Sequence, residues 1–161
     1  LDVGCNMGIF VNGMNDKGFS EVVGYDINRM SIDRGKEVFE DVADKLVVKD
    51  ISGTIDEEDK YDVVLISDVI SYVGSPNETL SNINKVLKKE GVCYLNSVII
   101  DSEKFTQDPR GYPPVGNGEH ITLFTAAGLK KILNDNGLVT EEYGEWQNNE
   151  EEMIFWKCRK G

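Results

Sequence analysis

The stretch "LDVGCNMGIF", residues 1–10, places two glycines four positions apart directly after a short apolar run. Gly4 and Gly8 carry no side chain, so the backbone around them can pass close to a ligand. Asn6 stands at the tightest point of the expected turn, and asparagine accepts a positive φ better than most residues. A helix beginning near Met7 would offer free N–H groups to an anionic ligand group. The stretch therefore predicts a strand, a ligand-binding turn and a helix.

The same alternation of strand and helix continues along the chain. Runs rich in Val, Ile and Leu predict strands at 1–3, 21–26, 45–50, 61–67 and 92–100. Their continuous hydrophobicity is typical of parallel strands that are covered on both faces. Helical patterns lie between them, at 8–17, 30–43 and 78–89. This order predicts an α/β doubly wound, mostly parallel, Rossmann-like sheet.

The C-terminal part of the sequence no longer alternates regularly between strand and helix. The helix at 78–89 is expected to end at Gly91, and residues 101–119, with three of the four prolines, are expected to form a long irregular loop. A further helix is predicted from Thr125 to Asn136. Two last strands, at 138–147 and 151–160, predict an antiparallel hairpin that brings the sheet to seven strands. We expect one domain over residues 1–161.

Charge and composition exclude several classes of protein. Seventeen basic against 29 acidic residues give a net charge of −12, and no cluster of Lys and Arg interrupts it. A surface that follows nucleic-acid phosphates is therefore not expected. No apolar stretch approaches the roughly 20 residues that span a bilayer, so no membrane is expected. The three cysteines, Cys5, Cys93 and Cys158, lie far apart and indicate reduced, buried thiols in a cytoplasmic protein.

Acidic residues stand at the ends of the predicted strands. Asp26 ends the second strand, where a carboxylate can accept both hydroxyls of a ribose. After the third strand, Asp50 could take an adenine amino group while Ile51 covers the ring. Asp2, directly before the first turn, would attract an ammonium group and repel phosphates. Each acid could instead serve only its own turn or cap, and the two glycines could only permit close packing of strand and helix.

The spacing of the glycines distinguishes between the binding sites of two cofactors. A nicotinamide-dinucleotide site requires G-x-G-x-x-G, whereas this turn reads G-x-x-x-G with Asn6 at the middle position. A ligand with an amino group, a carboxylate, a ribose and an adenine but no phosphate fits the acids better. That description matches S-adenosylmethionine.

These segments, in this order, resemble the class I S-adenosylmethionine-dependent methyltransferases of the small-molecule type. "LDVGCNMG" resembles the first motif of that family, with Asn6 in place of its middle glycine. "GYDIN", "VKDI" and "YDVVLISDVISYV" are similar to the next three. The resemblance implies that Ile27 packs on the adenine and that Ser67 lies near the methionine end. It also leads us to expect helices before strand 1 that this sequence lacks, so that its N-terminal cap is missing.

The predicted site follows from both arguments. The predicted cofactor-binding residues are Asp2, Gly4, Cys5, Asn6, Gly8, Asp26, Ile27, Asp50, Ile51 and Ser67. The single histidine, His120, is the candidate base for a small-molecule acceptor, although it could only anchor its loop. The turn "SDVISYVGSP" contains no histidine, so no catalytic metal is expected.

Some alternatives stay open. Tyr72, Tyr112 and Phe105 could line an acceptor pocket or could only pack. For the whole chain, the alternatives are a methyltransferase-like module that binds without turnover, a nicotinamide-dependent oxidoreductase and a nucleic-acid methyltransferase.

Overall fold

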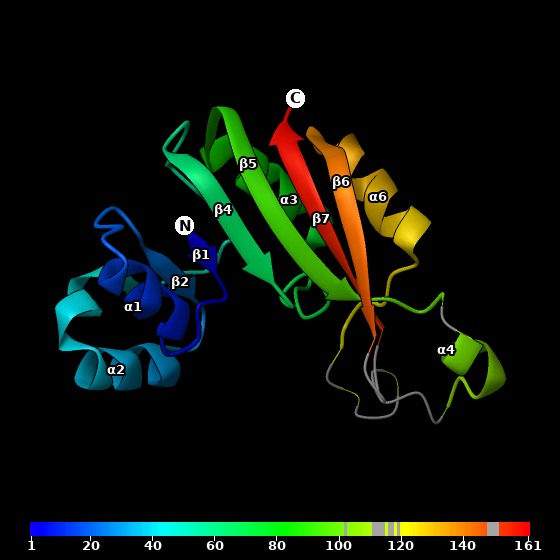
Figure 1. The fold of residues 1–161 in the computed structure, drawn as a ribbon, viewed down its shortest axis with the longest axis horizontal. Coiled ribbons are helices and arrows are strands. Elements are labelled where there is room, and N and C mark those ends of the chain that lie inside the picture. The colour runs from blue at the N-terminus through cyan, green and yellow to red at the C-terminus, as the bar shows by residue number, and fades with distance from the viewer. Residues whose placement is uncertain (102, 111–114, 116–117, 119, 148–151) are drawn as a thin grey trace.

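A single mixed sheet organises the chain (Figure 1). The computed structural model describes residues 1–101, 103–110, 115, 118, 120–147 and 152–161. Within this part of the chain, seven strands pair in the order β3-β2-β1-β4-β5-β7-β6. Their bounds are β1 Asp2–Val3, β2 Gly24–Asp26, β3 Leu46–Val48, β4 Tyr61–Ser67, β5 Leu87–Val98, β6 Leu138–Gln147 and β7 Glu152–Lys160. The first five run parallel, and β7 pairs antiparallel with both β5 and β6. The predicted α/β doubly wound sheet with its C-terminal hairpin is confirmed.

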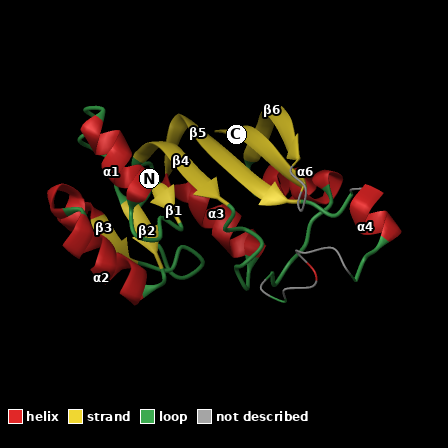
Figure 2. Ribbon diagram, turned by 60° about the horizontal axis from the view of Figure 1, so that its bottom comes forward, coloured by secondary structure: helices red, strands yellow, loops and turns green. Residues whose placement is uncertain are grey.

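Helices connect the parallel strands. Their bounds are α1 Ile9–Asp16, α2 Arg29–Val38, the 3-10 helix η1 Glu40–Lys45, α3 Pro76–Val86, α4 Glu103–Gln107 and α6 Ala126–Asp135. Figures 1 and 2 place α3 and α6 together on one face of the sheet formed by β4, β5, β7 and β6. The main hydrophobic core lies there, and the fully buried Leu80, Ile83 and Val86 of α3 belong to it. A second core, around Val11 and Ile32, joins α1 and α2 to β3.

Two of the predicted helix boundaries are wrong, and the strands expected at 21–26, 45–50 and 92–100 lie at 24–26, 46–48 and 87–98. The helix expected at 78–89 ends at Val86, and Leu87 already pairs with Tyr61 as part of β5. The reversal that follows uses Glu90 with a φ of +65°, whereas Gly91 does not have a positive φ. The other wrong boundary concerns the helix expected at 30–43, which is interrupted at Phe39, where the backbone leaves helical angles before η1 begins.

The irregular loop expected at 101–119 is only partly irregular. It contains the short helix α4. Eight of its positions lie outside the described residues: Ser102, 111–114, 116–117 and Glu119, so that the candidate pocket residue Tyr112 is among them. The helix predicted from Thr125 agrees closely, because the Thr125 side chain caps α6 by accepting from Gly128 N–H.

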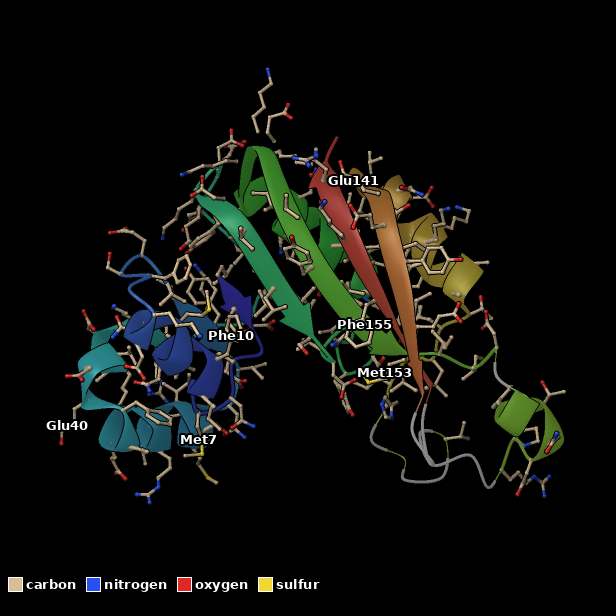
Figure 3. The ribbon with its side chains drawn as sticks, viewed as in Figure 1. Met7, Phe10, Glu40, Glu141, Met153 and Phe155 are labelled. Atoms are coloured by element: carbon tan, nitrogen blue, oxygen red, sulfur yellow. The ribbon has the colours of Figure 1, made fainter. Side chains whose placement is uncertain are left out.

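The other face of the sheet is open over its central strands. Strand pairing puts Leu65, Tyr94 and Lys157 side by side on this face, and Tyr94 is largely exposed. Figure 3 labels Phe155 on β7 and, separately, Phe10 on α1, and both side chains are exposed. None of the helices in the described part of the chain has the length and apolar character needed to span a membrane.

Candidate functional site

The turn after β1 adopts the conformation that its sequence predicts. Gly4, Asn6 and Gly8 all have positive φ angles, of +73°, +52° and +83°. A Cβ on Gly4 would lie 2.2 Å from Cγ2 of Val69, in the turn after β4. A Cβ on Gly8 would lie 2.4 Å from Cδ2 of Leu46, so Gly8 is needed where the start of α1 packs against β3. Gly4 therefore allows the turn after β4 to come close, whereas Gly8 allows a helix to pack closely against a strand. The alternative reading, that the glycines only permit such packing, thus applies to Gly8.

Asp26 is held as a preformed acceptor at the end of β2. Its Oδ2 accepts the N–H of Asn6 at 2.8 Å, and its Oδ1 accepts the N–H of Asn28 at 2.7 Å. Asn28 in turn caps α2 by accepting from the N–H groups of Met30 and Ser31. Each carboxylate oxygen can accept about two hydrogen bonds, so capacity remains for a ligand. The first turn and the second strand therefore meet at one oriented carboxylate.

A cleft of about 550 Å³ opens at the carboxyl ends of β1, β2, β3 and β4. Six of the predicted cofactor-binding residues line it: Gly4, Asn6, Asp26, Ile27, Asp50 and Ile51. Ile27 lines the cleft although 70% of its surface is exposed, whereas Ile51 is buried. An exposed apolar side chain beside two carboxylates provides a surface on which an aromatic base could stack. The cleft residues therefore fit an adenosine group.

The other four predicted cofactor-binding residues do not line this cleft. Cys5 is buried in the second core, close enough to Gly24 that a Cβ there would lie 2.6 Å from its sulfur. Gly8 packs against Leu46, as described above. Ser67 is exposed on the open face of the sheet, where its hydroxyl pairs with Asn96. Asp2 is buried and directly precedes the lining residues Val3 and Gly4.

All three cysteines are free and buried. In the part of the chain that the structure describes, no group of three or more His, Cys, Asp or Glu side chains could hold a metal ion.

Burial changes the electrostatics of Asp2. It raises the pKa of the Asp2 carboxyl to about 6; the positive charge of the Leu1 amino group partly opposes this effect, and the negative charge of Asp26 adds to it. Because burial still disfavours the ionised form, a further cationic group nearby would stabilise it. This arrangement is consistent with the ammonium group that the sequence leads us to expect.

The pKa of Asp2 predicts a pH dependence of ligand binding. If the ammonium group of S-adenosylhomocysteine requires ionised Asp2, affinity rises with pH as Asp2 deprotonates. With a pKa of about 6, the ionised fraction and hence the affinity rise about tenfold between pH 5 and pH 7. Calorimetry at both pH values measures this change, with Asp2→Asn as the control. A variant that keeps the full pH dependence would show that another group causes it.

Asp68 belongs to the cleft although its role was not predicted. It follows β4 directly, has a φ of +53°, and its N–H donates to Oδ1 of Asn96 at 2.6 Å. Its own Oδ1 is buried and has no hydrogen-bond partner. Burial raises the pKa of this carboxyl, and the charge of His120 partly opposes that effect. A strained backbone and an unsatisfied carboxylate oxygen together indicate a functional position.

His120 lies behind the cleft wall. Its ring stacks on Tyr72, which lines the cleft, with ring centroids 4.6 Å apart. The N–H groups of Ile121 and Thr122 both donate to the carbonyl of Ser71, which ties this segment to the turn after β4. Both ring nitrogens are buried without a hydrogen-bond partner. The prediction that the segment approaches the acceptor end of the site is thus consistent with its position, while Glu119 lies outside the described residues.

Comparison with known proteins identifies the family. Residues 1–143 match the family described as a methyltransferase domain. The chain belongs to this methyltransferase family. The recognition of a methyltransferase from its strand-end motifs is therefore confirmed.

One curated protein gives a narrower comparison. The tRNA U34 carboxymethyltransferase of Helicobacter pylori (strain Shi470) is 32% identical over an alignment of 110 residues, and the match covers 63% of this methyltransferase and 41% of that protein. The matched part thus spans less than half the length of that relative.

Solved structures share the fold. An S-adenosylmethionine-dependent methyltransferase from Mesorhizobium loti superimposes with a TM-score of 0.80 at 14% identity, covering 98% of this chain and 88% of its own. A second, from Methanosarcina mazei, gives 0.79 at 18%, with 99% and 90% covered. The [4+2]-cyclase SpnF gives 0.77 at 12%, with 99% and 74% covered. The cofactor predicted from the sequence agrees with the first two, and the third shows that this fold also carries other chemistry.

Proposed function

We propose that this methyltransferase binds S-adenosylmethionine in the cleft and transfers its methyl group to a small-molecule acceptor. The observation that carries the proposal is the set of three carboxylates, Asp26, Asp50 and Asp68, that line one cleft at the ends of β2, β3 and β4. Such a cleft suits hydroxyl, amino and ammonium groups and repels the phosphates of a nicotinamide dinucleotide.

Each end of the cleft would bind a different part of the cofactor. Asp26 would bind the ribose hydroxyls, Ile27 and Ile51 would cover the adenine, and Asp50 would accept its amino group. Bound S-adenosylmethionine would supply the methyl group and its own leaving group. The chain then has to orient the acceptor, an effect worth ~7–11 kcal/mol in favourable cases.

His120 is the proposed base for an acceptor hydroxyl. His120 does not itself line the cleft, so this role would require the Tyr72 side chain to move aside and open a path from the acceptor to one of the unpartnered ring nitrogens of His120. A positioned base contributes ~10²–10⁴-fold to a rate. If the acceptor needs no deprotonation, His120 would only anchor its segment.

The curated relative raises tRNA as a second candidate acceptor and carboxymethyl as a second candidate group. The net charge of −12 opposes a nucleic-acid surface. A carboxymethyl donor carries a further carboxylate, which calls for a cation near the transferred group. Among the described lining residues, the only cation is Lys49, beside Asp50 at the adenine end. A small, uncharged group transferred to a small acceptor therefore agrees best with the site.

The buried free thiols support a reducing, cytoplasmic location.

Binding measurements test the cofactor first. S-adenosylmethionine and S-adenosylhomocysteine are expected to raise the melting temperature of the protein, while NAD(H) leaves it unchanged. Stabilisation by NAD(H) alone would contradict the proposal. A release assay for S-adenosylhomocysteine with candidate acceptors then measures turnover. Tight cofactor binding without turnover on any small molecule or tRNA would favour a binding module instead.

A further inference from the structure

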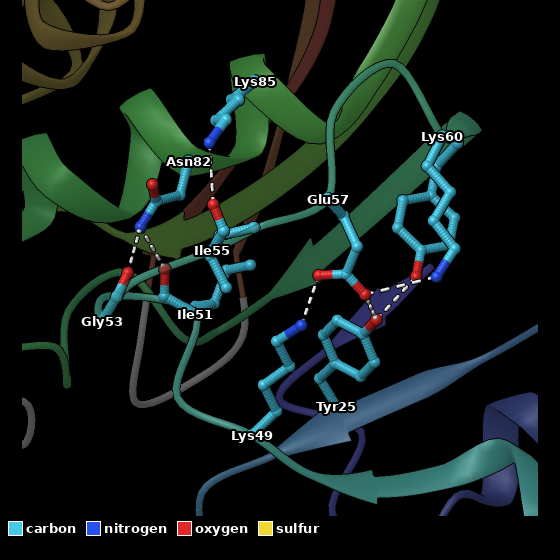
Figure 4. A network of polar contacts seen from close by, with 10 residues as sticks. Tyr25, Lys49, Ile51, Gly53, Ile55, Glu57, Lys60, Asn82 and Lys85 are labelled. Carbon is cyan, nitrogen blue, oxygen red and sulfur yellow. Dashed lines mark hydrogen bonds and ion pairs between the residues drawn. The ribbon is translucent and has the colours of Figure 1, made fainter.

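The segment that closes the adenine end of the cleft, residues 50–57, has no regular secondary structure of its own (Figure 4). It carries Asp50, Ile51 and Ser52, which all line the cleft. Asp50 Oδ1 accepts both the N–H and the hydroxyl of Ser52, at 2.8 and 2.7 Å. One oxygen of Asp50 is therefore engaged inside its own turn. The direction of the other oxygen depends on how the turn itself is held.

Asn82 of α3 holds this turn from outside the cleft. Its Nδ2 donates to the carbonyl of Ile51 at 2.7 Å and to that of Gly53 at 2.8 Å. An amide nitrogen has two hydrogens, so both are used on one turn. Asn82 does not line the cleft, and Figure 4 shows it reaching the segment from the helix. It can therefore act on a ligand only through the turn.

The remaining anchors hold the far end of the segment. Lys85, one turn after Asn82, donates to the carbonyl of Ile55 at 2.7 Å. Glu57 accepts the Tyr25 hydroxyl at 2.6 Å and pairs with Lys49 and Lys60. Burial raises the pKa of Glu57, but the hydrogen bonds from these three residues outweigh it and lower the pKa to about 2. Glu57 is therefore ionised at neutral pH, and its contacts fix the segment where it returns to β4.

We propose that Asn82 is a positioning residue that fixes the Ile51–Gly53 turn and thereby sets the preference of the cleft for adenine. The inference rests on the proposed function, because it concerns the adenine end of the same cleft. Without the two Asn82 bonds, Ser52 still closes the Asp50 side chain locally, but nothing on α3 holds the turn carbonyls. Asp50 would then lose its fixed direction toward the base, while Asp26 and the ribose end would keep theirs.

The test compares two ligands that differ only at the base. S-inosylhomocysteine carries a carbonyl oxygen in place of the amino group of S-adenosylhomocysteine, so it presents an acceptor where the adenosyl ligand presents a donor. Calorimetry on the full chain gives the affinity ratio. Wild type is expected to prefer the adenosyl ligand by about tenfold or more, as for one hydrogen bond to a charged acceptor. Asn82→Ala is expected to weaken adenosyl binding by about ten- to thirtyfold and to bring the ratio close to one. Ser81→Ala, an exposed neighbour on the same helix, should leave both affinities unchanged.

A second variant and a second measurement test the same proposal. Asn82→Asp keeps the side-chain shape but cannot donate, so it should lose the preference as well and serves if the alanine variant does not fold. Hydrogen exchange at the amides of Ser52 and Gly53 should accelerate in the variants without ligand. A variant that keeps the preference, or a wild type that has none, would overturn the inference. A wild type that binds neither ligand would instead overturn the proposed function.

Discussion

Asp26→Ala is expected to abolish measurable binding of S-adenosylhomocysteine. The Asp26 carboxylate is the proposed acceptor for both ribose hydroxyls, and hydrogen bonds to a charged partner contribute about 1.5–3 kcal/mol each. The loss of two such bonds predicts an affinity at least about 100-fold lower. The substitution also removes the acceptor for the N–H groups of Asn6 and Asn28, so the turn after β1 keeps only its backbone bonds to the Tyr25 carbonyl of β2.

Calorimetry with purified variants measures this effect. His120→Ala is the matched control, because His120 lies behind Tyr72 at the other end of the site and does not line the cleft. It should bind S-adenosylhomocysteine like wild type. Circular dichroism and the melting temperature should show that Asp26→Ala is folded. Equal loss of binding in both variants would mean that the cofactor pocket has been misplaced.

The positions of the strands and helices along the chain could be predicted because the hydrophobic pattern and the glycines that separate the elements agree locally. Leu80, Ile83 and Val86 recur at helical spacing and are all buried. The same helical spacing wrongly placed Leu87 in the helix. Leu87 continues the apolar pattern of α3 but pairs with Tyr61 in the sheet. A buried leucine satisfies either element, so the sequence alone could not locate this boundary. Only the pairing partner decides it.

The cofactor end of the site was more predictable than the acceptor end. Asn6 has the positive φ of the turn after β1, and the Asp26 carboxylate accepts its N–H. Both features are indicated by the residue types. The family resemblance implied that Ser67 lies near the methionine end, yet side chains alternate along a strand and Ser67 shares the open face with Leu65. Asp68, one position later, lines the cleft. Residues 63–66 are all apolar and show no alternation of polarity, so the sequence alone did not indicate which residue at the end of β4 would face the cleft. The position of His120 depends on the Ser71 carbonyl, a distant contact with no sequence signature.

Gly4→Ala is expected to destabilise the fold and to weaken cofactor binding together. At a φ of +73° an L-residue is strained by about 1–2 kcal/mol. The new methyl would also lie 2.2 Å from Cγ2 of Val69, so the turn after β1 and the turn after β4 would have to separate. Both turns line the cleft. We therefore expect a loss of at least about 2 kcal/mol in the free energy of unfolding and of at least about tenfold in affinity for S-adenosylhomocysteine.

A second glycine provides the control for this prediction. Gly13 lies in α1 without a positive φ, and a Cβ there would meet no atom within 4 Å. Gly13→Ala should therefore stabilise the protein slightly, by about 0.5–1 kcal/mol. The double variant Gly4→Ala/Val69→Ala removes the overlap but not the strain at φ, so it should recover only part of the lost stability. Urea unfolding of all three separates the two contributions. If Gly4→Ala unfolds like wild type, the turn tolerates a side chain at Gly4 and the contact with Val69 does not set the shape of the cleft.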